Sequence, residues 1–173
     1  MANIVLIGMP GCGKSTVGVL LAKALQMDFV DTDIVLQQQQ GKKLQEIIDQ
    51  VGNDAFLKME EDCVRGLECD QTVVATGGSV VYGKEAMRCL HENGLVVYIQ
   101  LPYEEIERRL SNLATRGVTL KKGQTLRNLY DERIPLYEAE ADYTFEPEEG
   151  DVQETVLDLA QRLSARMEAD NGR

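Results

Sequence analysis

The stretch that most constrains the fold is a glycine-rich run near the N-terminus, Gly8-Met9-Pro10-Gly11-Cys12-Gly13-Lys14-Ser15. It has the spacing G-x-x-x-x-G-K-S/T of a phosphate-binding loop. An apolar run at 4–7 precedes it, as a buried strand would, and residues 16–25 continue with helical periodicity. In such a strand–loop–helix unit, backbone N–H groups and the helix N-terminus bind phosphate oxygens. The sequence therefore predicts a nucleoside triphosphate site, and a glycine-rich turn without a ligand is the alternative.

Three side chains of this run have specific expectations. The ammonium group of Lys14 should reach the β- and γ-phosphates of the nucleotide. The hydroxyl group of Ser15 should bind Mg²⁺. Cys12 lies inside the loop, where a buried small residue is expected rather than a reactive thiol.

The rest of the chain alternates between strand-like and helical segments. Four further apolar runs of strand length lie at 28–31, 72–75, 96–99 and 143–145. Helical patterns separate or follow them at 34–40, 44–51, 53–67, 84–92, 103–113, 125–139 and 151–168. This alternation predicts an α/β fold of three layers, α/β/α, with a five-stranded and mainly parallel sheet. Because there is no internal repeat and no linker, we expect a single domain over residues 1–173.

Helical spacing also predicts which side chains enter the core. In 53–67 the apolar residues that recur at this spacing are Phe56, Met59, Cys63 and Leu67. The acidic run 60–62 is expected on the opposite side of that helix. In 151–168 the expected core face consists of Val152, Val156, Leu159 and Leu163.

Composition limits the possible partners and location. The net charge of −11 disfavours binding to nucleic-acid backbones and to anionic membrane surfaces. No apolar stretch approaches the ~20 residues of a membrane span, and no signal peptide is evident. The 4 cysteines show neither a C-x-x-C pair nor zinc-ligand spacing, as is typical of reduced thiols in the cytosol. We expect a cytoplasmic monomer.

Two carboxylates follow the second predicted strand, in the run Asp31-Thr32-Asp33. Ligands of open α/β sheets bind at the carboxyl ends of the strands, so this position favours a functional site. The alternative is helix capping, because Asp and Thr commonly cap helices. In many phosphate-loop enzymes an Asp after the strand beside the loop helps to hold Mg²⁺, but here Thr76-Gly77-Gly78-Ser79 follows that strand. Asp31 and Asp33 are therefore the nearest candidate carboxylates.

The most basic and loop-like stretch is 113–124, which contains Arg116, Lys121 and Lys122. In so acidic a protein, a basic loop indicates a mobile lid that closes over phosphates. A solvated surface loop is the alternative.

Taken in order, these motifs resemble those of shikimate kinases, which are small P-loop kinases of the nucleoside-monophosphate-kinase-like group. The matching residues are the phosphate loop and its continuation to Gly18, the run from Phe29 to Asp33, Phe56, Glu60, the run from Ala75 to Gly78, Glu132-Arg133-Ile134-Pro135-Leu136-Tyr137, and Ala141-Asp142. The resemblance covers about residues 1–160.

The resemblance implies ATP- and Mg²⁺-dependent phosphorylation of a hydroxyl group on a small molecule, most directly shikimate to shikimate 3-phosphate. Helices within 34–67 would bind the substrate, and 113–124 would be the lid. The implied catalytic residues are Lys14, Asp33 and Arg116. The implied ATP-binding residues are Gly11, Cys12, Gly13, Lys14, Ser15, Thr16, Arg109 and Arg116, with Arg109 against the adenine. Ser15 and Asp31 would bind the metal.

The implied substrate-binding positions are Asp33, Leu57, Glu60, Gly77, Gly78, Ser79 and Arg133. Asp33 would orient or deprotonate the acceptor hydroxyl, and Arg133 would bind the substrate carboxylate. Backbone N–H groups of Gly77 and Gly78 would contact the substrate.

The chain departs from the family pattern at three places. Leu57 stands where the family has an arginine that clamps the shikimate carboxylate. Ser79 replaces the third residue of a Gly-Gly-Gly run, and the lid reads Arg116-Gly117-Val118-Thr119-Leu120 where the family has Arg-Pro-Leu-Leu. Two alternatives to a shikimate kinase follow, namely a related kinase for another small hydroxyl compound and a nucleotide-binding module without phosphotransfer.

Overall fold

The computed structural model describes residues 2–111, 118, 120–147 and 151–171. Its centre is a parallel sheet with the strand order β2-β3-β1-β4-β5. The strands are β1 (Asn3–Ile7), β2 (Asp28–Asp31), β3 (Thr72–Ala75), β4 (Gly94–Ile99) and β5 (Tyr143–Phe145). In the middle of the sheet, Val5 pairs with Val74 on one side and Val96 on the other. The predicted five-stranded parallel sheet is confirmed.

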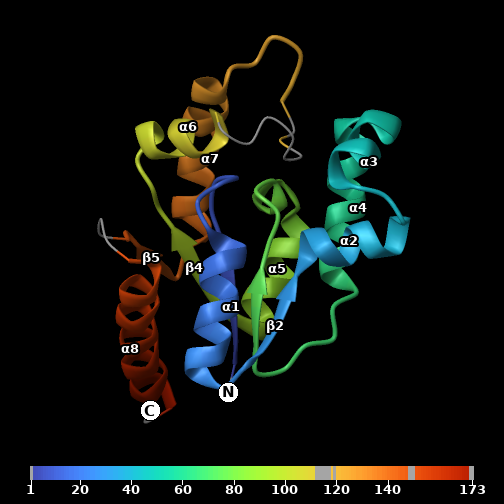
Figure 1. Ribbon diagram of the computed structural model, residues 1–173. Helices are drawn as coiled ribbons and strands as arrows, with labels where there is room; N and C mark the ends of the chain where they lie inside the picture. Colours follow the sequence, from blue (N-terminus) through green and yellow to red (C-terminus); the bar gives the residue numbers. More distant parts are fainter. Residues whose placement is uncertain (1, 112–117, 119, 148–150, 172–173) are drawn as a thin grey trace.

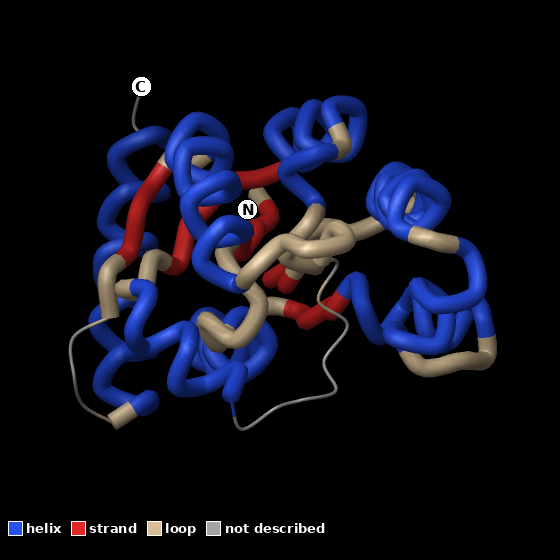
Figure 2. Tube along the Cα trace, turned by 90° about the horizontal axis from the view of Figure 1, so that it is seen from above, coloured by secondary structure: helices blue, strands red, loops and turns tan. Residues whose placement is uncertain are grey.

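Helices cover both faces of this sheet, as the view from above shows (Figure 2). They are α1 (Lys14–Leu25), α2 (Thr32–Gln40), α3 (Leu44–Val51), α4 (Asn53–Arg65), α5 (Lys84–Asn93), α6 (Tyr103–Ser111), α7 (Leu126–Glu140) and α8 (Val152–Asn171). α1 packs against α8, whereas α5 and α7 both pack against β4 (Figure 1). Strands β1 and β3 are buried along their whole length, because a parallel sheet covered on both faces exposes neither side to water.

A second, smaller apolar cluster lies outside the main core. It joins α2, α3 and α4 through the buried side chains Leu36, Ile47, Ile48, Phe56 and Cys63. These helices gather at the right of Figure 1, beyond the edge of the sheet formed by β2. They follow β2 directly, so one face of this group lies beside the carboxyl ends of the strands.

The prediction for the acidic run 60–62 was wrong at its first residue. Glu60 is only 3% exposed, whereas Asp62 lies on the exposed side of α4. Glu60 follows Phe56 by four residues, and this spacing places both side chains on one face of a helix. The face predicted from apolar residues therefore also carries a buried carboxyl group.

Other differences from the predicted segments are small. α2 begins at Thr32 rather than at residue 34, because the Asp31 side chain accepts hydrogen bonds from the N–H groups of Asp33 (3.0 Å) and Ile34 (3.3 Å). A short 3₁₀ helix, η1 (Val80–Tyr82), follows the glycine pair and was not predicted. Val152 was expected in the core but is 38% exposed, because it occupies the first turn of α8.

None of the helices in the described ranges is both long and apolar enough to cross a membrane.

One glycine of the sheet allows a close backbone approach. Gly94 begins β4 and pairs with Asn3, and a Cβ atom there would lie 2.8 Å from the Asn3 carbonyl oxygen. Because that neighbour is backbone, Gly94→Ala should lower the free energy of unfolding by about 1–3 kcal/mol, as overpacking does. Urea denaturation measures this loss. The control Gly66→Ala, whose Cβ would meet no atom closer than 3.4 Å, should cost less; equal losses would contradict the explanation.

Candidate active site

The phosphate loop joins β1 to α1 in a conformation that needs glycine. Gly8, Gly11 and Gly13 have φ angles of +144°, +78° and +101°, which side-chain-bearing residues rarely adopt. A Cβ atom on Gly8 would also lie 2.7 Å from the carbonyl oxygen of Ile99. Cys12 is buried, as expected for a small residue inside the loop. The loop thus leads directly into the N-terminus of α1, where Lys14 is the first helical residue.

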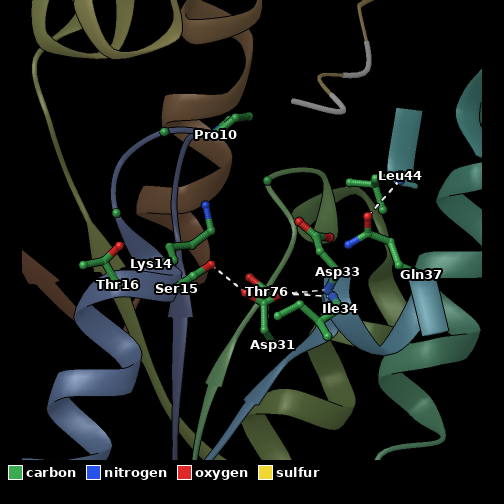
Figure 3. A pocket seen from close by; sticks show the side chains of 13 residues that line it. Pro10, Lys14, Ser15, Thr16, Asp31, Asp33, Ile34, Gln37, Leu44 and Thr76 are labelled. Carbon is green, nitrogen blue, oxygen red and sulfur yellow. Dashed lines mark hydrogen bonds between the residues drawn. The ribbon is translucent and has the colours of Figure 1, made fainter. Parts of the chain in front are cut away.

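Lys14 lies within this loop and is only 7% exposed. Its Nζ atom donates hydrogen bonds to the carbonyl oxygens of Gly8 (2.8 Å) and Met9 (3.0 Å). Figure 3 shows Lys14 entering the same pocket as Ser15, Asp31 and Asp33. A cation held at the start of a helix beside loop N–H groups suits an anionic ligand.

The predicted metal-binding pair is brought together. Ser15 Oγ donates a hydrogen bond of 2.6 Å to Asp31 Oδ2, and Asp31 Oδ1 caps α2 (Figure 3). Asp31 can therefore both cap a helix and bind a metal ion, because one carboxylate oxygen contacts α2 and the other contacts Ser15. Hydroxyl and carboxylate oxygens are the donors that Mg²⁺ prefers, so the pair fits this ion. Mg²⁺ commonly binds through one or two protein groups together with waters and phosphate oxygens.

Asp33 lies at the junction of two pockets. It lines the pocket of the phosphate loop and also a narrow pocket beside it. Burial raises the pKa of its carboxyl group to about 6, the Asp31 charge adds to the increase, and Lys14 opposes it. Asp33 therefore stands where a phosphate donor and an acceptor could meet.

The narrow pocket is formed by residues far apart in the sequence. Its lining is Pro10, Asp33, Leu44, Phe56, Glu60, Gly77, Gly78, Ser79 and Arg133. A Cβ atom on Gly77 would lie 2.0 Å from Glu60 Oε1 and 2.8 Å from Asp33 Oδ1. One on Gly78 would lie 2.8 Å from Pro10 Cδ. The glycine pair thus lets two acidic side chains and the phosphate loop pack closely together.

One N–H group of the glycine pair is bonded within the protein. The Gly77 N–H group donates a hydrogen bond of 3.2 Å to Thr32 Oγ1, and its contact with a substrate stays a prediction. This hydrogen bond joins the start of α2 to the turn after β3 across 45 residues, and no local pattern predicts it. Gly78 still lines both pockets beside Asp33.

Helix α7 contributes Arg133 to the narrow pocket, and two further side chains of the matched run bond to neighbouring elements. The Arg133 guanidinium is 1% exposed and lies 5.3 Å from the centroid of the Tyr82 ring. One turn later, Tyr137 donates a hydrogen bond of 2.5 Å to the Gly78 carbonyl oxygen. Glu132 accepts a hydrogen bond of 2.5 Å from the Tyr82 hydroxyl. Tyr82 was missed, because nothing in its local sequence points to α7.

Arg109 contacts the other end of the phosphate loop. Its Nη1 atom donates to the carbonyl oxygens of Gly11 and Cys12, both at 3.3 Å, and its Nε atom bonds to Glu105. A pocket beside it is lined by the loop, by α6 and by the start of α8, and includes Thr16 and Pro147. Arg116 lies outside the described residues.

Comparisons with known proteins agree with this geometry. A family model described as shikimate kinase matches residues 10–164. A shikimate kinase from Vibrio parahaemolyticus is 35% identical over 167 residues, which are 95% of this chain and 97% of the relative. One from Clostridium botulinum is 40% identical over 137 residues, or 78% of this chain and 81% of the relative.

The chain belongs to the shikimate kinase family. The structure of the Acinetobacter baumannii shikimate kinase in complex with shikimate superposes with a TM-score of 0.86 at 31% identity, and covers 98% of this chain and 94% of that one. The Aquifex aeolicus shikimate kinase gives 0.81 at 30% identity, with 95% and 98% covered. The predictions of the family, of the P-loop kinase fold and of an ATP-dependent kinase are therefore confirmed.

The departures from the shikimate kinase pattern can now be placed. Leu57 is half-buried and lines an outer pocket of about 640 Å³, which shares Arg133 with the narrow pocket. Lys58, the neighbouring cation, lies on the exposed side of α4, where its Nζ atom pairs with Asp62 at 3.8 Å. Lys121 and Lys122 line the pocket of Leu57 instead.

The described end of the predicted lid contacts two helices. Lys121 Nζ lies 3.4 Å from a Glu132 carboxylate oxygen of α7. The Asn53 side chain of α4 donates a hydrogen bond of 3.2 Å to the Leu120 carbonyl oxygen.

Burial of Glu60 gives a testable pH dependence of stability. Burial raises the pKa of this carboxyl group from 4.5 to about 7, although the Ser79 hydrogen bond lowers it. The folded protein therefore holds this proton more tightly than the unfolded chain, and the free energy of unfolding falls as the pH rises from about 4.5 to 7. Glu60→Gln removes this loss. The free energy of unfolding of the variant, relative to that of the wild-type protein, should therefore be higher at pH 8.5 than at pH 4.5 by on the order of 3 kcal/mol.

Urea denaturation at the two pH values measures the difference. Asp62→Asn makes the same charge change on the exposed face of α4 and should show no comparable gain at high pH. An equal effect of Glu60→Gln at both pH values would show that the carboxyl group ionises without a burial penalty.

Proposed function

We propose that this protein transfers the γ-phosphoryl group of ATP to a hydroxyl group of shikimate, forming shikimate 3-phosphate. The observation that carries the proposal is the position of Asp33, which lines both the pocket of the phosphate loop and the narrow acidic pocket. Phosphoryl transfer needs the acceptor oxygen in line with the donor phosphate, and two pockets that share a carboxylate suit this requirement. The similarity to a shikimate kinase with shikimate bound supports the choice of acceptor.

On the donor side, N–H groups of the loop from Gly11 to Thr16 bind the phosphates, and Lys14 exchanges its loop carbonyl contacts for β- and γ-phosphate oxygens. Ser15 and Asp31 are the residues that would hold Mg²⁺, whose charge neutralises phosphate oxygens when it is bound. The adenine lies in the pocket beside Arg109, whose guanidinium is already fixed by Glu105.

On the acceptor side, Asp33 accepts a hydrogen bond from the hydroxyl group that is phosphorylated and orients or deprotonates it. Arg133 binds the shikimate carboxylate with its buried guanidinium, whose planar N–H groups can donate two parallel hydrogen bonds. Lys121 and Lys122 add positive charge at the rim, beside Leu57. Glu60 and Ser79 border the ring of the substrate, with Gly78 below it.

The segment 113–124 acts as the lid, and Arg116 brings its guanidinium to the transferring phosphoryl group. Closure excludes water, which otherwise competes as acceptor.

The protein acts as a monomer with a single domain over residues 1–173, because all the proposed site residues belong to one chain. Residues 34–67 form the substrate-binding part of this domain. The 4 cysteines are free, which fits a cytoplasmic enzyme.

A second candidate is a kinase of the same class with a different hydroxyl acceptor, and Leu57 is the observation that favours it. A leucine donates no hydrogen bond to a carboxylate, so an acceptor without a carboxylate at that point fits the outer pocket equally well.

An ADP-release assay with shikimate and a panel of polyols separates the two candidate functions. Turnover of shikimate, with its 3-phosphate identified by mass spectrometry, supports the proposal. Turnover of another acceptor alone supports the second candidate, and ATP binding without any turnover contradicts both.

Asp33→Asn tests the acceptor role of this carboxylate. Because the amide is a poor base and a weaker hydrogen-bond acceptor, kcat should fall at least about 100-fold. ATP affinity should change little, since Asp31 and not Asp33 bonds to Ser15. Steady-state kinetics and ATP titration by calorimetry measure the two effects. Full activity of this variant would rule out the assigned role.

Leu57→Arg tests the substrate pocket. A guanidinium beside Arg133 can add a charge-assisted hydrogen bond of about 1.5–3 kcal/mol to the carboxylate, so the KM for shikimate should fall about 10- to 100-fold. The KM for ATP should stay the same. Lys58→Arg is the matched control on the exposed side of α4. If the KM for shikimate is unchanged in Leu57→Arg, position 57 does not limit acceptor binding.

A further inference from the structure

The carboxyl group of Glu60 is held at one oxygen only. Ser79 Oγ donates a hydrogen bond of 2.5 Å to Glu60 Oε2, and both side chains are buried. Glu60 Oε1 is also buried but has no hydrogen-bond partner among the described residues. Oε1 lies against Gly77, in the narrow pocket that Asp33 and Arg133 also line. A buried carboxylate oxygen without a partner is costly, so this atom is a position where a ligand donor would be favourable.

The hydrogen bond fixes which oxygen faces the pocket. A carboxyl group can rotate about its last side-chain torsion, whose preference is broad. Ser79 stands at the end of the glycine run, just before η1, and its hydroxyl reaches back to α4 across 19 residues. With Oε2 bound there, Oε1 remains on the Gly77 side, next to Asp33 Oδ1.

We propose that Ser79 is a positioning residue of the acceptor site: its hydroxyl holds one oxygen of Glu60 and thereby presents the other to a hydroxyl group of a polyol acceptor. This inference rests on the proposed function for the identity of the acceptor but not for the Ser79–Glu60 contact itself. A glycine at this position lacks the hydroxyl, so Ser79 gives this chain a means of orienting Glu60 that the Gly-Gly-Gly pattern does not contain.

The charge of Glu60 depends on the groups that surround it. Asp33 on α2 disfavours its ionised form, as burial does, whereas Arg133 on α7, Lys14 on α1 and the Ser79 hydroxyl favour it. Cys63 is the further titratable neighbour on α4 itself; burial raises the pKa of its thiol, and the charges of Glu60 and Asp33 add to the increase. Ser79 is the neutral group that donates a hydrogen bond to Glu60, so it can be changed without altering the net charge of the pocket.

An NMR titration measures the pKa of the Glu60 carboxyl group directly in the intact protein without nucleotide. Protein labelled with ¹³C at the glutamate carboxyl carbons is titrated by NMR, and Glu60→Gln assigns the signal. In Ser79→Ala the pKa of Glu60 should rise by at least half a unit, because a donor to the ionised form is lost. Thr72→Val, which removes a buried hydroxyl bonded to the Asp70 carbonyl oxygen at the far end of β3, should leave this pKa unchanged. An unchanged pKa in Ser79→Ala overturns the inference.

Kinetics with shikimate supply the second arm. In Ser79→Ala the KM for shikimate should rise about 5- to 20-fold at pH 7, with less effect at pH 9, where Glu60 is ionised in both proteins. The KM for ATP should not change, and Ser79→Thr, which keeps the hydroxyl, should recover most of the loss. A shifted pKa with an unchanged KM for shikimate would overturn the acceptor role. If the wild-type protein does not phosphorylate shikimate, the proposed function fails, while the NMR titration still decides whether Ser79 holds Glu60.

Discussion

The hydrogen bond between Ser15 and Asp31 joins the two halves of this site. Ser15 belongs to the phosphate loop at the start of α1, and Asp31 ends the neighbouring strand β2 and caps α2. One carboxylate therefore fixes the loop, the end of the sheet and the start of α2 relative to one another. If Asp31 moved, Asp33 would move with it, because its N–H group is bound to the same side chain. The distance between the pocket of the phosphate loop and the narrow pocket depends on this contact.

The narrow pocket concentrates negative charge in a place where folding alone would not favour it. Asp33 and Glu60 approach each other across Gly77, and both carboxyl groups have raised pKa values because they are withdrawn from water. Such an arrangement lowers stability at neutral pH and is characteristic of sites where groups are arranged for binding or proton transfer. Arg133 and Lys14 offset part of the repulsion and are themselves buried, so each charge in the pocket depends on the others. The buried polar cluster is consistent with a site that binds a polar and anionic acceptor.

The outer pocket is built differently from the narrow pocket beside it. Around Leu57 the side chains come from α4, from η1, from α7 and from the described end of the basic segment 113–124. Glu132 accepts hydrogen bonds from the Tyr82 hydroxyl, the Lys121 ammonium group and the Gln124 amide. It thereby connects α7 to η1 and to the basic segment. The positive charge of the outer pocket comes from Lys121 and Lys122, whose long side chains are exposed. The narrow pocket instead contains the buried guanidinium of Arg133. A buried guanidinium is a rigid group, whereas exposed lysine side chains can adapt their positions.

Sequence alone determined the parts of this protein that depend on local pattern. The phosphate loop, the five strands and the order of the helices followed from glycine spacing and apolar periodicity, because these features act within a few residues. The pair Asp31 and Asp33 also followed, since parallel strands end at one edge of the sheet. Only the tertiary structure decided what the acceptor pocket contains. Glu60 and Ser79 are 19 residues apart, Tyr82 and Glu132 are 50 apart, and Arg109 meets Gly11 across 98. Such contacts depend on how helices pack, so a residue such as Glu60, whose two neighbours in sequence are only half-buried, became recognisable as buried only in the folded chain.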